Sequence, residues 1–145
     1  MWFQIDRALV GNRRWAACYR REMEAHELAE VAARREAAGT PYLEFITVPD
    51  LSVGLYVLAP GQPDLQQPHT EDEAYYVVAG SGRISVGDEV RDVRPGSVVF
   101  VAAGVPHRFH DITSELSILV VFGPAEGSRA LPAPPPIPGP HPGPE

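Results

Sequence analysis

The feature that most constrains the fold is a succession of short apolar segments, separated by turn-forming residues, between residues 42 and 122. Each segment is four to seven residues long, and pairs such as Pro-Asp, Pro-Gly and Gly-Asp interrupt the series. Short strands that recur about every 8–12 residues are typical of an antiparallel sandwich or barrel. No alternation of strands with helices follows residue 42, which argues against a parallel α/β sheet. We therefore expect an all-β domain with strands at 43–48, 52–58, 74–79, 83–86, 89–93, 97–101, 107–112 and 116–122.

A helical segment precedes these strands. Residues 23–38 place Leu28, Val31 and Ala32 on one apolar stripe, and Gly39 is a suitable helix stop. Because a chain of 145 residues suits one domain, we expect a single folded unit over residues 23–124 that consists of this helix and the strands.

The two ends of the chain differ from this unit. Residues 1–22 hold five arginines and both tryptophans without a clear period, so we expect an extension that is either not native or poorly ordered. The alternative is that its tryptophans cover the barrel. Eight of the fourteen residues in 132–145 are prolines, which predicts a disordered tail over residues 125–145. Such a tail is either solvated or a ligand for a proline-binding module.

Charge and composition limit the partners. The net charge is −7, and residues 23–123 hold fifteen acidic residues against six arginines, which disfavours a nucleic-acid partner. There is no run of 18 apolar residues, so we expect no membrane partner. The single cysteine, Cys18, excludes an internal disulfide and a cysteine-based zinc site. We expect a cytoplasmic protein.

Two histidines and a glutamate are candidate metal ligands. Glu73 opens an apolar strand, and a buried carboxylate there requires a cation, a hydrogen-bond partner or a metal. His107 follows a tight turn, and if it points inward then Phe109 and Asp111 share its face. His69, Glu73 and His107 together would form a 2-His-1-carboxylate set. Such a set suits Fe(II) and also accepts Mn, Ni, Zn or Cu. Composition alone favours the alternative that the histidines are unrelated surface or core residues.

The spacing of these residues along the chain bears on whether they form one metal site or are unrelated. In the first stretch, Gly61 is separated by five residues from Gln67, and then come His69, Glu73 and Gly80. This stretch resembles the first motif of the cupin superfamily, G-x5-H-x-H-x3-E-x6-G, with Gln67 in place of the first histidine.

The second stretch lies fifteen residues further along the chain. It runs from Gly96 through Ala102 and Gly104 to His107 and Asp111. It resembles the second cupin motif, G-x5-P-x-G-x2-H-x3-N, with alanine for proline and aspartate for asparagine. The resemblance covers about residues 40–123 and is typical of a small single-domain bacterial cupin.

The resemblance implies a jelly-roll antiparallel β-barrel whose interior holds a metal. By this resemblance His69, Glu73 and His107 are the ligands of one divalent ion, most often Fe(II), and Gln67 is a weak ligand or contacts substrate. The alternative is a metal-free pocket. Tyr75, Phe109 and Asp111 are the expected lining of a substrate pocket, although core packing is an alternative for the two aromatic residues.

The function that this resemblance implies is metal-dependent chemistry on a small-molecule substrate, with dioxygenase as the first choice and isomerase or lyase as alternatives. A non-catalytic ligand-binding or sensor cupin is the competing class. Apolar residues on both faces of the strands at 74–79 and 116–122 also predict a homodimer.

Overall fold

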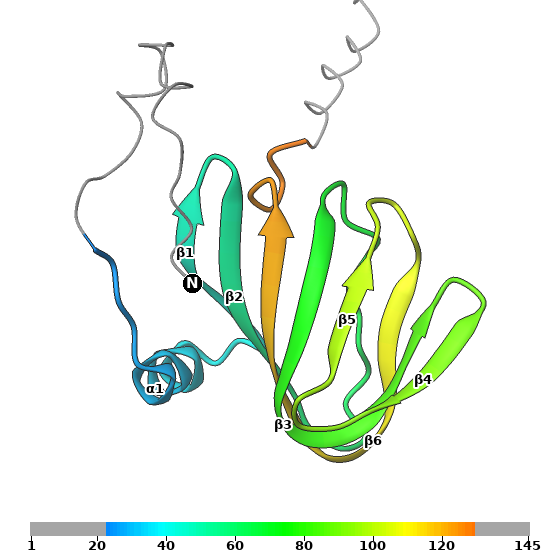
Figure 1. Cartoon of the computed structure of the whole chain (residues 1–145). Coiled ribbons are helices and arrows are strands. Elements are labelled where there is room, and N and C mark those ends of the chain that lie inside the picture. Colours follow the sequence, from blue (N-terminus) through cyan, green and yellow to red (C-terminus); the bar gives the residue numbers. More distant parts are fainter. Residues whose placement is uncertain (1–22, 130–145) are drawn as a thin grey trace, which may run out of the picture.

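The computed structural model describes residues 23–129, so the predictions for residues 1–22 and for the proline-rich segment 132–145 lie outside the described residues. One helix precedes six strands (Figure 1). Their bounds are α1 Leu28–Ala38, β1 Tyr42–Val48, β2 Leu51–Leu58, β3 Asp72–Val86, β4 Glu89–Val93, β5 Val98–Val101 and β6 His107–Gly123.

Helix α1 is shorter than the sequence predicts. It begins at Leu28 rather than near residue 23, because Glu27 at its N-cap has an extended backbone with φ −87° and ψ 126°. It ends where expected, at Gly39 in the left-handed conformation. Within the described residues, no helix is long and apolar enough to cross a membrane.

Two pairs of predicted strands are each one continuous strand. Segments 74–79 and 83–86 form β3, and segments 107–112 and 116–122 form β6. Gly80 and Gly82, which lie between the two segments of β3, mark a bend rather than a chain reversal. At Gly80, φ is 84° and a Cβ atom would collide with the backbone carbonyl of Glu115, so glycine allows β6 to approach β3 closely. The pairing of β3 with β6 shifts register around this point.

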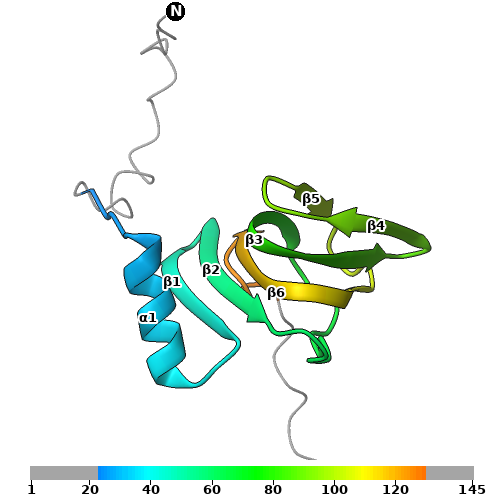
Figure 2. The same ribbon diagram turned by 90° about the horizontal axis from the view of Figure 1, so that it is seen from below.

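The strands form a curled antiparallel sheet in the order β1-β2-β6-β3-β4, and β5 pairs with β3. The first half of β3 pairs with β5 and the C-terminal half of β6, and its second half pairs with β4 and the N-terminal half of β6. Because both long strands bend, the sheet folds over on itself (Figures 1 and 2). This curvature closes the interior in which the candidate site lies.

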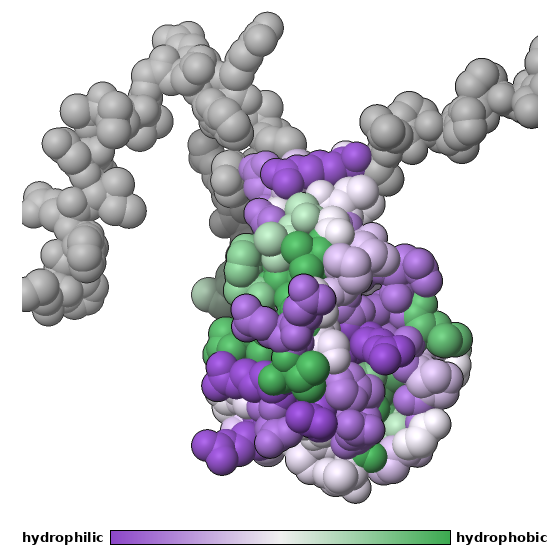
Figure 3. All heavy atoms as spheres, turned by 90° about the vertical axis from the view of Figure 1, so that its right-hand side faces the viewer, coloured by the Kyte–Doolittle hydropathy of each residue, from purple (hydrophilic) through white to green (hydrophobic). Residues whose placement is uncertain are grey.

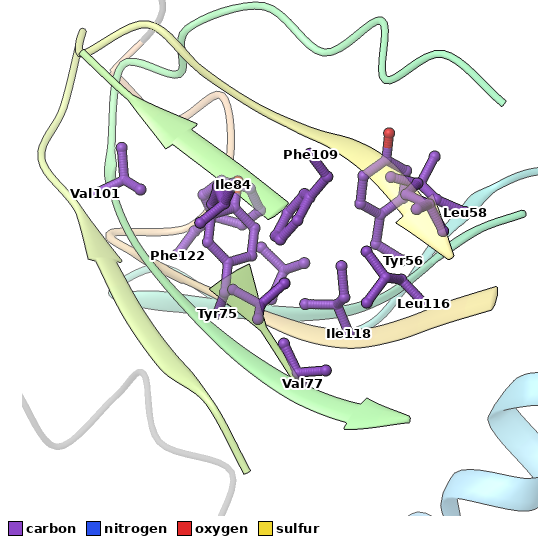
Figure 4. Close-up of a cluster of buried hydrophobic side chains, with 13 residues drawn as sticks. Tyr56, Leu58, Tyr75, Val77, Ile84, Val101, Phe109, Leu116, Ile118 and Phe122 are labelled. Carbon is purple, nitrogen blue, oxygen red and sulfur yellow. The ribbon is translucent and has the colours of Figure 1, made fainter. Parts of the chain in front are cut away.

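The interior of the curled sheet holds the main core. Figure 4 shows its aromatic and aliphatic side chains converging from β2, β3 and β6. Tyr75 and Phe109 are each 1% exposed and meet edge to face, with ring centroids 5.1 Å apart. Both residues thus belong to the core, and this packing fixes the ring of Tyr75.

A second, smaller core lies on the outer face of the sheet. Helix α1 lies beside β1 and β2 (Figure 2), and its Val31 packs with Leu55 and Val57 of β2. Farther along the sheet, Val98 and Phe100 are exposed. The side of the molecule next to β4 shows separate groups of hydrophobic residues among hydrophilic ones (Figure 3).

The folded contacts continue beyond the predicted boundary at residue 124. Ala125 is buried, and the backbone N–H of Glu126 donates to the Ser52 hydroxyl. The N–H of Arg129 donates to the carboxylate of Glu71, 2.8 Å away. The tail prediction for 125–145 therefore begins too early, because these residues find hydrogen-bond partners on β2 and beside β3 that proline-rich composition does not reveal.

Candidate metal centre

The centre of the site is the carboxylate of Glu73. Glu73 is near the start of β3, where it pairs with Val101 of β5 and Phe122 of β6, and it is 2% exposed. Its Oε1 atom lies 3.1 Å from Nε2 of His107 and 4.0 Å from Nε2 of His69. A buried carboxylate is costly unless it is paired, and here both ion-pair partners are imidazoles rather than arginines.

The ring of His107 is held by a backbone hydrogen bond. His107 is the first residue of β6, and its Nδ1 atom lies 2.8 Å from the carbonyl oxygen of Val105, to which it donates. Nε2 therefore faces Glu73, where it either shares a proton with the carboxylate or offers its lone pair to a metal. Burial lowers the pKa of His107, but the hydrogen bonds with Glu73 and Val105 outweigh burial and raise that pKa above its ordinary value.

His69 approaches from the irregular segment before β3. Its ring packs against Phe122 at a centroid distance of 4.9 Å, and its Nδ1 lies 3.6 Å from a carboxylate oxygen of Glu126. A carboxylate on the far nitrogen of a ligating histidine is a common way to orient the ring toward a metal. The carbonyl of His69 accepts a hydrogen bond from the N–H of Gly104, which joins the two motif loops.

These three residues fit a metal ion. One ligand atom from each of His69, Glu73 and His107 can be chosen so that all three lie within 4.8 Å of one another. Two ligands of one ion at about 2.1 Å are at most about 4.2 Å apart. The separations of 3.1 and 4.0 Å from Glu73 Oε1 to the two imidazoles meet this condition, and all three ligand atoms lie within 4.8 Å of one another, so the group could hold an ion. The structure thus brings together the three ligands that the cupin resemblance implied.

Tyr75 adds a hydroxyl to this centre. The hydroxyl donates to Oε2 of Glu73 and lies 2.9 Å from Nε2 of His107. Burial and the neighbouring Glu73 carboxylate raise the pKa of Tyr75 well above its ordinary value, so the hydroxyl keeps its proton. Since Oε2 is engaged by Tyr75, Oε1 is the oxygen that faces both histidines.

Comparison with known proteins now decides the family. The sequence profile of the cupin domain matches residues 54–122. SCO3923 of Streptomyces coelicolor, an uncharacterized protein, is 49% identical over 104 residues, which cover 72% of this chain and 99% of that protein. This chain belongs to the cupin family.

Solved structures share the cupin fold. TT1209 from Thermus thermophilus is 27% identical with a TM-score of 0.58, over 71% of this chain and 99% of that chain. An oxalate decarboxylase variant from Bacillus subtilis is 26% identical with a TM-score of 0.53, over 57% of this chain and 25% of that chain. The likeness to the decarboxylase therefore concerns one quarter of its chain and not the whole enzyme.

Gln67 does not take part in the centre of this cupin. Its side chain is exposed, whereas the side chain of its neighbour Gln66 reaches the hydroxyl of Tyr75 at 3.3 Å. The resemblance assigned Gln67 to the site because it occupies the position of the first histidine in the first motif. Gln67 and His69 lie in a segment without regular structure, so their spacing along the chain does not fix where their side chains point.

Asp111 also departs from the prediction. It was expected beside His107 and Phe109 on the inner face, but its side chain is 63% exposed and contacts His110. Asp111 has a φ of +48°, which breaks the alternation of β6, so the next buried residue is Ile112. Of the three predicted pocket residues, Tyr75 reaches the centre with its hydroxyl, and Phe109 lies in the core behind it.

Sequence reasoning missed three acidic residues. Asp64 accepts hydrogen bonds from the Tyr56 hydroxyl and the Phe109 N–H, both at 2.7 Å, and so ties the irregular segment to two strands. Glu71, which precedes β3, is 1% exposed and accepts hydrogen bonds from the Thr70 hydroxyl and from the N–H of Arg129. Glu126 lay in the predicted tail. Their common signal was position just outside predicted strands, which is too general to identify them.

A cavity of about 290 Å³ opens beside His69. Its walls come from β1, β2, β6, the irregular segment before β3 and the C-terminal turn. The principal lining residues are Tyr42, Tyr56, Leu65, His69, Phe122 and Glu126. The expected pocket thus exists on one side of the candidate ligands, but different residues line it.

Proposed function

We propose that this cupin is a metal-dependent enzyme that acts on a small molecule, and that its reaction class is dioxygen-dependent oxidation. The observation that supports the proposal is the arrangement of His69, Glu73 and His107 around one point next to a cavity. Two imidazoles and one carboxylate leave coordination positions free, which is the ligand set of non-haem Fe(II) oxygenases. Fe(II) is our first choice of ion, and Mn, Ni, Zn and Cu are alternatives.

A bound ion would act as a Lewis acid or an oxygen-activating centre and would orient the substrate. The residues of the chain prepare the site for that chemistry. Tyr75 holds Oε2 of Glu73, and Val105 holds Nδ1 of His107, so both ligands have fixed orientations. Phe122 packs against His69 and keeps the side of the centre next to the cavity apolar. Lyase and isomerase chemistry use the same kind of centre, so the fold leaves the reaction open.

One observation favours the alternative of a non-catalytic binding or sensor cupin. The hydroxyl of Tyr75 satisfies Glu73 and lies within hydrogen-bond distance of His107. Glu73 and His107 can therefore be paired without a metal, and the cavity could still hold a ligand. Metal content, followed by oxygen consumption with candidate substrates, distinguishes these two functions.

The first test compares two histidines on the same strand. The protein, reconstituted anaerobically with Fe(II) and desalted, should retain close to one ion per chain. His107→Ala should lose most of it, because the ligand atom nearest to Glu73 Oε1 is removed. His110→Ala is the matched control, since His110 contacts Ser85 and Asp111 on the other face and should leave metal content unchanged. Wild-type protein that stays metal-free with Fe, Mn, Ni, Zn and Cu would contradict the proposal.

The second test addresses the oxidation chemistry. Nitric oxide, a stable substitute for dioxygen, should bind the Fe(II)-loaded protein and give the electron paramagnetic resonance signal of a high-spin iron–nitrosyl centre. Oxygen consumption with candidate small molecules then tests turnover. Iron that is bound but unreactive toward nitric oxide would reject the dioxygenase assignment and leave the metal site itself standing.

A further inference from the structure

The cavity beside His69 has a marked charge character. Among the described residues, no lysine or arginine lines it, whereas the carboxylate of Glu126 does. The side chain of Glu126 is 32% exposed, which places it between the interior and the solvent. Glu126 is therefore the acidic side chain on the wall of this cavity, and its carboxylate favours a cationic group over an anionic one next to it.

Aromatic rings form a second feature of the cavity. Tyr42 of β1 and Tyr56 of β2 are cross-strand partners. Their rings meet edge to face, with centroids 6.3 Å apart and planes at 75°. Both rings have fixed positions. The hydroxyl of Tyr56 donates to Asp64, and the ring of Tyr42 lies against Gly54, where a Cβ atom would collide with it. Rigid aromatic rings near carboxylates attract cations through their negative faces.

The chemistry of a matching ligand follows from these two features. A cationic group gains Coulomb attraction from Glu126 and cation–π attraction from the tyrosine rings. A neutral group of the same shape gains only apolar contact, and a carboxylate is repelled. The cavity volume of about 290 Å³ limits the ligand to a small molecule.

We propose that this cavity binds a small organic cation, an ammonium or other onium compound, with its charged group at Glu126, Tyr42 and Tyr56 and its other end toward His69. This inference deepens the proposed function, on which it rests, because it names the substrate class for the same site. It also separates this cupin from the oxalate decarboxylase, whose name specifies a dicarboxylate substrate.

The experiment uses choline as the probe and the full chain loaded with Fe(II) under anaerobic conditions. The matched comparison is the neutral carbon isostere of choline, in which a tert-butyl group replaces the trimethylammonium group. Isothermal titration calorimetry should show choline binding about tenfold or more tightly than the isostere. The neutral isostere lacks both the cation–π attraction and the charge attraction. Equal binding of the two compounds, or no binding of choline, would overturn the proposal.

Variants locate the binding. Glu126→Gln should weaken choline binding about tenfold and change isostere binding little, because glutamine keeps the size of the side chain and removes its negative charge. Since Glu126 also lies 3.6 Å from Nδ1 of His69, the metal content of this variant is measured on the same sample. Glu89→Gln, at an exposed residue that does not line the cavity, is the matched control and should change neither affinity. A Glu126→Gln protein that binds choline as tightly as wild type would place the cation elsewhere and contradict the inference.

Metal content, measured on the same samples, separates this inference from the proposed function. Full metal loading without choline binding would reject the cation class and leave the metal-dependent function intact. Choline binding that requires Glu126 in protein that cannot retain metal would support the cavity assignment and reject the metal-dependent enzyme in favour of a binding module.

Discussion

At the scale of single residues, the site depends on which atoms hold Glu73. Its Oε2 is bound by Tyr75, and its Oε1 faces His69 and His107. One carboxylate oxygen is thus held by a hydroxyl, and the other oxygen faces the two imidazoles. Outer partners of this kind commonly affect metal affinity nearly as much as the ligands do.

Tyr75→Phe should weaken metal binding about tenfold to a hundredfold, because the Glu73 carboxylate loses the hydroxyl that orients it. The ring remains, so its packing against Phe109 and the fold should persist. Competition with a chelator measures the affinity, and circular dichroism checks the fold. Tyr76→Phe is the control, since Tyr76 is 45% exposed and follows Tyr75 on the opposite face. Unchanged affinity in Tyr75→Phe would show that Glu73 needs no such support.

Gln67→His restores the histidine of the first cupin motif, and on sequence alone it should complete a four-residue metal set. The structure predicts a different result, because the Gln67 side chain is exposed. Affinity for Zn and Ni should remain within about twofold of wild type, a change of roughly 0.4 kcal/mol. A clear gain in affinity, measured by chelator competition, would mean that this segment rearranges when metal binds.

At the scale of elements, the bend of β3 and β6 determines the shape of the interior. Both strands are continuous, yet each contributes to two parts of the curled sheet. The bend depends on close approach between Gly80 and the backbone at Glu115. Local backbone chemistry at one glycine therefore positions ligands that lie on different strands.

Gly80→Ala should destabilise the protein by about 2–4 kcal/mol, because a positive φ and a collision with the Glu115 carbonyl act together. Gly96→Ala is the matched control. Its φ is +89°, but nothing lies within 4 Å of the added Cβ, so only the strain of about 1–2 kcal/mol should appear. Urea unfolding measures the free energy of unfolding of both variants. Equal losses in the two variants would show that close approach at Gly80 contributes nothing.

At the scale of the whole molecule, the outer face of the sheet is only partly covered. Helix α1 covers β1 and β2, but Tyr76, Val98 and Phe100 remain exposed on a shared face of β3 and β5. Exposed apolar residues that adjoin one another are typical of interaction surfaces. The homodimer expected from the sequence stays a prediction, and this face is the place where we expect it to form.

Light scattering at high micromolar concentration should give about twice the chain mass of 15.8 kDa. Phe100→Asp should shift the protein toward the monomer, because it introduces a charge into an apolar contact. The control, Val48→Asp, changes another exposed apolar residue, which lies at the end of β1, away from β3 and β5. A wild-type monomer at that concentration would disprove the dimer, and a dimer unaffected by Phe100→Asp would place it on another surface.

The sequence by itself determined the features that depend on local period and spacing. Alternating apolar residues located the strands, and the resemblance of two spaced motifs to those of cupins identified His69, Glu73 and His107 as candidate ligands. Strand ends and turns are set by neighbouring residues, so these features can be read along the chain. The β-rich fold and the metal-ligand candidates were therefore predictable.

Only the tertiary structure decided where alternation fails and which distant segments meet. Gln67 turns outward in an irregular segment, and Asp111 turns outward at a positive φ. Glu126 comes from beyond the predicted boundary to lie beside His69 and line the cavity. The physical reason is that hydrogen bonds, such as that from the Glu126 N–H to the Ser52 hydroxyl, join residues far apart in sequence. Their partners exist only once the sheet has curled and brought the two together.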